Sequence, residues 1–381
     1  MNTILLIFAC SGKSEDSASY LDDLPNDTSD SSDTSDTSDT SDTSDTSDTS
    51  DTGPSYQYSH ALVTTADYSN GLGAIARIGL ETLSVEDNLI QNIHSDATAV
   101  VEEGIIFQIN RLGMDSIRIY EWENWSAPVT EWSTGDGSNP QSVVKCLDQV
   151  VTSLYAESYL AIYNMDGIIQ GQIDLSSYIP AGDLDGSPEA SSMVHIGNSA
   201  YVALQQLDLS GGPIALPTGP GLVLEIDCSS LSVLNNWEVG PNPDISAVGD
   251  QLLIRTGSYG QFDGGVRHLD TLDKTLSPLY FEDAETGVWF SGVTGTSSGQ
   301  IAINGFDVNT YESVLLCGDA TGVTEIERSA SSYYTHITTS DRDEFWLSTD
   351  QGIRIFDPSS CAELTESPIQ TSLSPSNVVF F

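Results

Sequence analysis

Hydrophobic and polar residues alternate in short runs along most of this chain, and glycine, proline, asparagine and aspartate separate the runs. The clearest case is Glu344–Asp357, where the apolar runs Glu344–Thr349 and Ile353–Phe356 flank a gap that contains Gly352. This pattern predicts two strands joined by a tight turn. Weaker copies follow one another from about His60 onwards. We therefore expect most of the chain to consist of short antiparallel strands.

Two short patterns recur and indicate a repeated unit. The first aligns Arg77–Val85, Glu225–Val233 and Ile355–Glu363, with Leu83, Leu231 and Cys361 in corresponding positions. The second places a proline before a short apolar strand, at Ser138–Val144, Pro241–Val248 and Leu373–Phe380. Units of roughly 40–50 residues with about four strands each are typical of a β-propeller. The first unit begins at His60, and the others begin near His94, Asn139, Ala190, Pro241, Thr286 and Ser331, which gives seven blades.

The two ends of the repeated region complement each other. The first unit opens with His60–Asp67, which is equivalent to a second strand, whereas Ser374–Phe381 has the pattern of an innermost strand with no unit after it. An open ring would leave strand edges and one blade face without a partner. We therefore predict an all-β fold over residues 59–381, a seven-bladed β-propeller closed by the C-terminal strand.

Two alternatives to this fold remain open. Residues Ala74–Ile93 also fit a helical spacing, although Gly71, Gly73 and Gly79 favour strands. An array of two or three β-sandwich domains would likewise give many short strands. No proline-rich linker follows Gly53 to separate such domains, so we favour the propeller.

The first ten residues resemble the signal peptide of bacterial lipoproteins. Ile7, Ala9 and Cys10 fit the lipobox, whereas Phe8 is bulkier than usual and no basic residue precedes the apolar run. The resemblance implies removal of residues 1–9, a lipid on Cys10 and, because Ser11 follows, the outer membrane or cell surface of a Gram-negative bacterium. An ordinary secretory signal or a chance apolar start is the alternative.

Residues 10–58 have the composition of a tether. Six Asp-Thr-Ser triplets run from Asp33 to Ser50. Such a segment buries too little apolar surface to offset the entropy of ordering it, and its regularly spaced charges repel one another. We expect a disordered, extended linker.

The charge balance excludes one class of partner. The chain has 11 Lys and Arg against 56 Asp and Glu, and a formal net charge of −45. Residues 1–59 hold Lys13 and 13 of the acids, which leaves 10 bases and 43 acids, a net of −33. Nucleic-acid binding needs clustered Lys and Arg and is not expected. Solubility, divalent-cation binding and repulsion from anionic surfaces are consistent with this charge, and solubility is the simplest interpretation.

The cysteines leave several arrangements open. With Cys10 lipidated, Cys146, Cys228, Cys317 and Cys361 permit three pairings in an oxidising compartment. The simpler interpretation is that each is a small buried residue on a strand. A zinc site is not expected, because no C-x-x-C occurs.

One loop has the residues of a cation site. Asp183, Asp185 and Glu189 offer hard oxygen ligands, and Gly186 permits a sharp turn between them. Such ligands suit Ca²⁺, although a solvated acidic loop explains the same residues. A second acidic cluster, Glu282–Glu285, is expected at the surface.

Other candidate chemistry is weaker. The five histidines, His60, His94, His195, His268 and His336, fall in different units, and no common catalytic motif occurs in a suitable context.

Trp122, Trp125 and Trp132 cluster in the second unit. Outer-strand packing is the favoured explanation of this cluster, and a carbohydrate or peptide platform is the alternative.

The repeats resemble those of YVTN-type seven-bladed propellers, most closely at Pro220–Leu234 and Gly240–Val248, and Phe345–Pro358 is similar to the repeats of sensor-kinase propeller domains. Over His60–Phe381 the chain resembles a surface propeller lipoprotein. The resemblance lies in blade-building positions, so it implies a fold and no ligand. We predict a lipid-anchored binding or scaffold module that meets a protein or glycan at one face. The alternative is a lactonase-like or quinoprotein-like enzyme with a metal or cofactor on the ring axis.

Overall fold

The computed structural model of the chain describes residues 58–122, 124–210 and 215–381. The signal peptide 1–9, the lipidation site Cys10 and all but the last residue of the tether lie outside the described residues. The described residues belong to one compact unit. Its described residues are mostly strands, so the predicted all-β class is confirmed.

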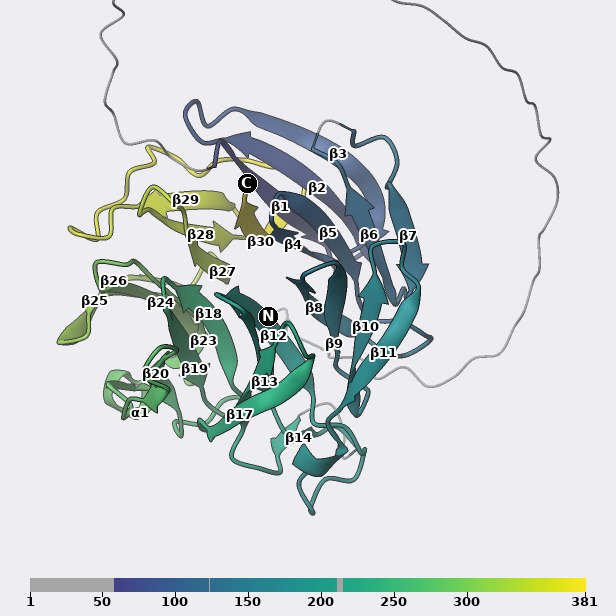
Figure 1. The fold of residues 1–381 in the computed structure, drawn as a ribbon. Helices are drawn as coiled ribbons and strands as arrows, with labels where there is room; N and C mark the ends of the chain where they lie inside the picture. The colour runs from purple at the N-terminus through teal and green to yellow at the C-terminus, as the bar shows by residue number, and fades with distance from the viewer. Residues whose placement is uncertain (1–57, 123, 211–214) are drawn as a thin grey trace, which may run out of the picture. The chain divides into compact units, whose positions relative to one another are not determined.

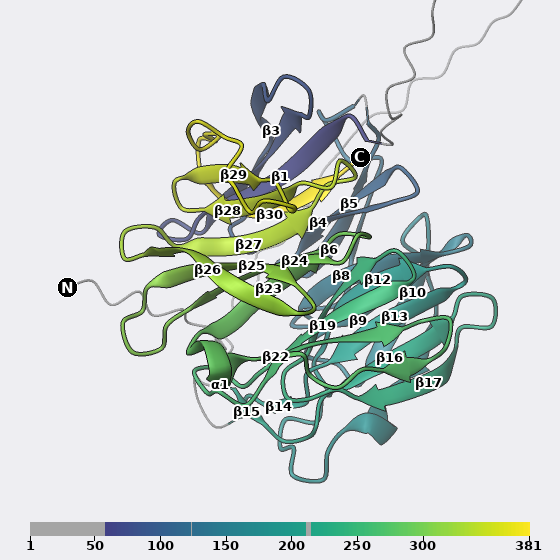
Figure 2. The same ribbon diagram turned by 90° about the vertical axis from the view of Figure 1, so that its left-hand side faces the viewer.

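Seven sheets surround a common axis in the described part of the chain, and this ring confirms the predicted seven-bladed β-propeller (Figure 1). Seen from the side, neighbouring sheets pack face to face (Figure 2). From the axis outwards, blade one contains β30 (Ser374–Phe380), β1 (His60–Asp67), β2 (Leu72–Gly79) and β3 (Val85–His94). In the same direction, blade two contains β4 (Thr98–Glu102), β5 (Ile105–Asn110), β6 (Ser116–Tyr120) and β7 (Thr130–Ser133). Blade three contains β8 (Pro140–Cys146), β9 (Gln149–Leu154), β10 (Tyr159–Asn164) and β11 (Ile169–Asp174).

The remaining blades carry the irregular features. Blade four contains β12 (Ala190–Ile196), β13 (Ser199–Leu204), β16 (Leu222–Asp227) and β17 (Ser232–Glu238), with the small hairpin of β14 (Leu207–Asp208) and β15 (Leu216–Pro217) inserted. Blade five contains β18 (Asp244–Val248), β19 (Gln251–Thr256), β20 (Gly265–Asp270), β21 (Thr275–Leu276) and β22 (Phe281–Glu282). Blade six contains β23 (Trp289–Gly295), β24 (Gln300–Phe306), β25 (Ser313–Asp319) and β26 (Gly322–Ser329). Blade seven contains β27 (Tyr334–Thr339), β28 (Phe345–Thr349) and β29 (Gly352–Phe356). The short helices are η1 (Ser176–Tyr178) and α1 (Asp283–Thr286).

The ring closes as the sequence predicts. Strand β30 pairs antiparallel with β1, and Val378 and Val379 lie opposite Val63 and Leu62. Val378 is 1% exposed and belongs to the apolar cluster between blades one and seven. The C-terminal strand therefore supplies the inner edge of the first blade and an interface with the last.

A recurring turn explains the first sequence repeat. Leu83, Leu231 and Cys361 all adopt left-handed backbone angles, with φ of 53°, 52° and 56°. The N–H of each donates a hydrogen bond of 2.8 Å to the carbonyl oxygen four residues earlier. The aligned stretches therefore share one tight turn at the end of a third strand. In Ala74–Ile93 this turn separates β2 from β3, so strands replace the helical alternative.

Blade seven departs from the expected four strands. After the turn at Cys361, the described chain makes only two isolated bridges to β29, Phe356 with Glu363 and Ile353 with Ile369. Pro368 lies in this segment and has no N–H to donate to a ladder. The outermost strand is therefore replaced by an irregular cover along the sheet edge.

The cysteines form two disulfides, so the interpretation as separate buried residues was wrong. Cys146 at the end of β8 pairs with Cys228 after β16, with the Cα atoms 4.7 Å apart. Cys317 on β25 pairs with Cys361, with the Cα atoms 6.0 Å apart. Each bond joins neighbouring blades, three to four and six to seven. Such pairs come together only when the blades stack.

No helix in the described ranges is both long enough and apolar enough to cross a membrane.

Candidate functional site

The predicted cation loop brings its three acids together. One carboxylate oxygen from each of Asp183, Asp185 and Glu189 lies within 4.8 Å of the others. The loop also engages these groups internally. Leu209 N–H donates to Asp185 Oδ2 at 2.7 Å, and Leu207 N–H donates to Glu189 Oε2 at 2.6 Å. The arrangement has hard oxygen ligands at short range, and the neighbouring backbone holds two of them in place.

Glu189 is the unusual member of the three. It is fully buried and has a left-handed φ of 49°. Burial raises the pKa of this carboxyl to about 9, against hydrogen bonds from Ser187 and Leu207 that lower it. Because the folded pKa is raised above 4.5, the contribution of Glu189 to stability is complete below pH 4.5 and is lost as the pH rises towards 9.

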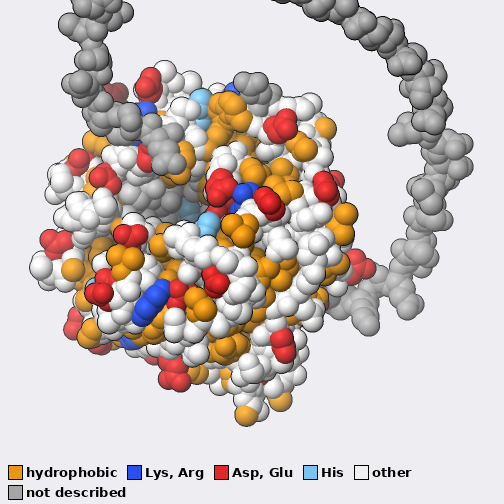
Figure 3. Space-filling model, viewed as in Figure 1, with side chains coloured by type: hydrophobic (Ala, Val, Ile, Leu, Met, Phe, Trp, Pro, Cys, Tyr) orange, Lys and Arg blue, Asp and Glu red, His pale blue; other side chains and the backbone are white. Residues whose placement is uncertain are grey.

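A second group of charged side chains gathers where the innermost strands of blades two, three and four end. Glu102 and Glu103 lie at the end of β4, Lys145 near the end of β8 and His195 near the end of β12. Lys145 Nζ is 2.5 Å from Glu103 Oε2, and His195 Nδ1 is 3.4 Å from Glu102 Oε2. Figure 3 shows one face of the ring, where cationic, acidic and histidine side chains lie close together near the middle. We call these four residues the axial mouth.

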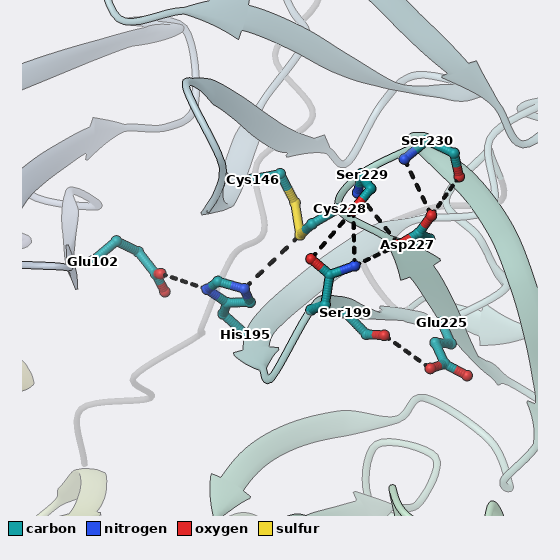
Figure 4. The surroundings of a disulfide bond; sticks show 10 residues. Glu102, Cys146, His195, Ser199, Glu225, Asp227, Cys228, Ser229 and Ser230 are labelled. Atoms are coloured by element: carbon teal, nitrogen blue, oxygen red, sulfur yellow. Dashed lines mark hydrogen bonds and ion pairs between the residues drawn. A yellow bond between two sulfur atoms is a disulfide. The ribbon is translucent and has the colours of Figure 1, made fainter.

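The orientation of His195 limits what it can do. Its Nδ1 faces Glu102, and its Nε2 is 3.9 Å from Cys228 Sγ in the Cys146–Cys228 disulfide (Figure 4). The hydrogen bond to Glu102 raises the pKa of His195, although burial opposes it. Both ring nitrogens therefore face protein groups, and the geometry favours a structural and electrostatic role over proton transfer to a substrate.

Replacing Glu102 by glutamine is expected to return the pKa of His195 towards its ordinary 6.5, because the hydrogen bond from a carboxylate is lost. The contribution of the pair to stability is complete below pH 6.5 and disappears as the pH rises through the raised pKa. Histidine ring NMR titrations measure the effect, with His195→Gln to assign the signal. Glu103→Gln is the matched control and should lower the pKa less, since Glu103 acts only through space. An unchanged pKa in Glu102→Gln would contradict the assignment.

An aromatic cluster lies on the same face of the ring. It contains His60, Trp122, Trp125 and Phe381, and the Trp122 and Phe381 ring centroids are 4.4 Å apart. The guanidinium of Arg77 lies 4.9 Å from the Trp122 ring. Both tryptophans are half-buried. We call this set the aromatic cluster. It joins blade one to blade two and leaves part of its ring surface accessible.

The third tryptophan confirms the packing interpretation. Trp132 on β7 is 7% exposed and packs against Tyr163 at 5.6 Å between ring centroids. Gly167 lies directly over it, since a Cβ there would meet Trp132 at 2.7 Å. Outer-strand packing therefore accounts for Trp132, whereas the glycan or peptide platform remains an interpretation of Trp122 and Trp125.

The inner strands carry hydroxyl groups and a few other polar side chains. Ser246 Oγ donates to the Val293 carbonyl oxygen at 3.3 Å, and Ser376 Oγ donates to the Thr64 carbonyl oxygen at 3.0 Å. These bonds secure the inner edges of blades. His336 on β27 lies 3.5 Å from the Asn377 amide, and burial lowers the pKa of His336 to about 4. The hydroxyl groups therefore bond to strand carbonyls at the inner edges of the blades, and His336 and Asn377 lie together on two innermost strands.

Two further places hold charged groups. The cluster Glu282–Glu285 is not wholly at the surface as expected, because Asp283 is 1% exposed at the start of α1.

A cleft of about 280 Å³ lies beside blade seven. In this cleft Arg354 already pairs with Glu327 and Glu363, at 2.6 and 2.5 Å. Its cation is therefore neutralised and unavailable for an anionic ligand.

Sequence reasoning missed the axial mouth. Glu102 and His195 lie in different repeats, and neither belongs to a motif. The signal that could have found them is their common place near the end of an innermost strand, which the alignment of blades defines.

Among the comparisons with known proteins, one solved structure supports the fold. No protein-family model and no curated protein matches the sequence. Among solved structures, the β-propeller domain of Cps50 (Swd1) from Myceliophteria thermophila matches with a TM-score of 0.53 and 10% identity, over 79% of this chain and 98% of that one. Apo AztD from Citrobacter koseri matches with a TM-score of 0.46 and 12% identity, over 84% and 97%. The seven sheets of the structure define a seven-bladed β-propeller protein, and the likeness to the Cps50 domain extends to the fold alone.

Proposed function

We propose that this protein is a YVTN-type propeller lipoprotein, anchored through Cys10 to the outer membrane or cell surface of a Gram-negative bacterium, where it binds or scaffolds a protein or glycan. The observation that carries the proposal is the shared face of the axial mouth and the aromatic cluster. Charged groups that set orientation beside partly exposed aromatic rings are the composition of a binding surface.

The net charge of the propeller limits the kind of partner that it can bind. Residues 60–381 carry a net charge of −33, and all but two of the described Lys and Arg are held in ion pairs. The uncompensated carboxylates favour a partner with a positive surface and speed its approach at low salt. A nucleic acid or an acidic surface is disfavoured for the same reason.

Two observations support the location and a role other than catalysis. Disulfides persist in oxidising compartments outside the cytoplasm, so two bonds between blades fit an exported protein. The imidazole of His195 faces a disulfide sulfur, which disfavours the enzyme alternative at the axial mouth. An enzyme would need its metal or cofactor elsewhere on the axis.

The anchor and the partner face are tested separately. Cys10→Ala should move the full chain from the detergent phase to the aqueous phase, and unchanged partitioning would overturn the anchor. A photo-crosslinking residue at Glu103, whose side chain is 60% exposed, should give a partner adduct on cells. The same residue at Tyr311, which is 76% exposed in the connection between β24 and β25, is the control and should give none. Equal adducts at both positions, or none at either, would contradict binding at the mouth.

We also propose that the loop of Asp183, Asp185 and Glu189 takes Ca²⁺. The support is the 4.8 Å grouping of the three carboxylate oxygens. Ionised Glu189 in a buried site is unfavourable without a cation, and Ca²⁺ offsets that cost.

Calcium is expected to stabilise the protein more strongly as the pH rises. Because Glu189 has a pKa of about 9 and releases its proton on binding, the affinity should increase about tenfold per pH unit below that value. Thermal unfolding with and without CaCl₂ at several pH values measures it. Asp185→Asn should remove the response, and Glu282→Gln, from the second acidic cluster, should keep it. Purified protein with no bound metal and no calcium-dependent shift would exclude the site.

A further inference from the structure

The most deeply buried cation of the propeller has no counter-ion in the described part of the chain. Arg255, the second-to-last residue of β19, is 5% exposed. Its Nε and Nη1 atoms are buried and make no hydrogen bond. Every other described Lys and Arg except Arg267 lies within 4.0 Å of a carboxylate oxygen. In a propeller with 43 acids and 10 bases, a cation this deeply buried without a counter-ion requires a physical explanation.

The surroundings of Arg255 compensate its charge only in part. Asp244 lies directly opposite on β18, but the two side chains form no ion pair within 4.0 Å. The guanidinium carbon lies 5.8 Å from the centre of the Trp289 ring, which gives a modest cation–π attraction. Burial lowers the pKa of Arg255. An uncompensated buried charge is strongly destabilising, and one carboxylate beyond ion-pair distance and one aromatic face offset it only in part.

Other polar atoms near the axis also lack partners. His336 on β27 and Asn377 on β30 belong to innermost strands, and the charge of Asp244 acts on both His336 and Arg255. His336 Nδ1 and Asn377 Oδ1 are buried without a hydrogen bond in the described structure. The His336 residue is half-buried by surface area. Protein atoms nevertheless surround its ring closely enough for burial to lower its pKa. The charge of Asp244 therefore acts both on Arg255 and on a histidine of the innermost strands that has an unpartnered ring nitrogen.

We propose that Arg255 marks an internal site that binds a small carboxylate, because its guanidinium is buried and has no counter-ion in the described part of the chain. The planar guanidinium presents parallel N–H donors that match the two oxygens of a carboxylate. This site is separate from the axial mouth, and it depends neither on the partner nor on the lipid anchor proposed above.

Acetate and malonate are the probes, with thermal unfolding of the full chain as the measurement. At constant ionic strength, replacing chloride by either probe should raise the unfolding temperature and saturate. Arg255→Met should abolish this response. Without carboxylate it should also raise the unfolding temperature, because the uncompensated buried charge is removed. Arg255→Lys should retain a weakened response, because lysine keeps the positive charge but lacks the two parallel N–H donors of the guanidinium. Arg118→Met, which removes an exposed cation paired with Glu131, should leave the response intact.

Three outcomes would overturn the proposal. One is a saturable response that persists in Arg255→Met, which places the anion elsewhere. A second is a wild-type response no different from chloride. A third is a fall in unfolding temperature for Arg255→Met in carboxylate-free buffer, which would show that Arg255 is a structural cation satisfied by Asp244. Binding of a partner at the axial mouth should be unchanged in all of these variants.

Discussion

Replacing Val378 by aspartate is expected to unfold the propeller or to leave it barely stable. Val378 is 1% exposed and packs among Ala61, Val63 and Trp346 where blade one meets blade seven. A carboxylate placed there has no partner, and burying one costs about 4–5 kcal/mol or more. That is a large part of the total stability of about 5–15 kcal/mol typical of a domain. Urea unfolding followed by tryptophan fluorescence measures the loss.

Two variants separate ring closure from simpler effects. Val378→Ala removes volume without charge and should cost about 1–3 kcal/mol. Leu234→Asp places the same charge on outer strand β17, where Leu234 is 53% exposed, and should change stability by no more than about 0.5 kcal/mol. If Val378→Asp resembled Leu234→Asp, the C-terminal strand would not hold the ring closed.

Removing the two disulfides is expected to produce the next largest losses. The Cys146–Cys228 bond spans 82 residues and the Cys317–Cys361 bond spans 44. Loop-closure entropy in the unfolded chain then predicts losses of about 4.5 and about 4 kcal/mol for the two double-serine variants. Both bonds also join neighbouring blades, so their loss should speed local opening at two interfaces. Equilibrium unfolding with and without a dithiol reductant measures the effect.

The Cys10→Ala variant provides the control, because it leaves both disulfides in place and should unfold at the wild-type midpoint. Free-thiol assays on the denatured protein check the pairing itself. Four reactive thiols from Cys146, Cys228, Cys317 and Cys361 in unreduced wild type, or losses below about 1 kcal/mol, would contradict the two bonds.

The blade count and the closure of the ring could be predicted from the sequence because both are local patterns repeated many times. Each blade contributes alternating apolar runs and, in several cases, the tight turn at Leu83, Leu231 or Cys361. A strand pattern that is ambiguous in one repeated unit can therefore be assigned from the same pattern in the other units. The missing strand of blade seven was not predicted, because its turn is normal and only the following segment, with Pro368, fails to pair.

The candidate sites differ in the same way, because one is built from residues close in the sequence and the other from residues far apart in it. Asp183, Asp185 and Glu189 fall within seven residues, so the sequence alone brought them together, although it contained no sign that Glu189 is buried. Glu102 and His195, by contrast, meet across blades two and four. No spacing rule relates residues so distant in the chain.

By itself, the sequence determined the fold class, the number of blades and the strand that closes the ring, because strand period and turn chemistry act between near neighbours. Only the tertiary structure decided which cysteines pair, which charges meet at the axial mouth and that Arg255 is buried without a counter-ion among the described residues. These properties depend on how the blades stack around the axis. Stacking brings together side chains that the chain order keeps apart, and it alone determines which polar groups lose contact with water.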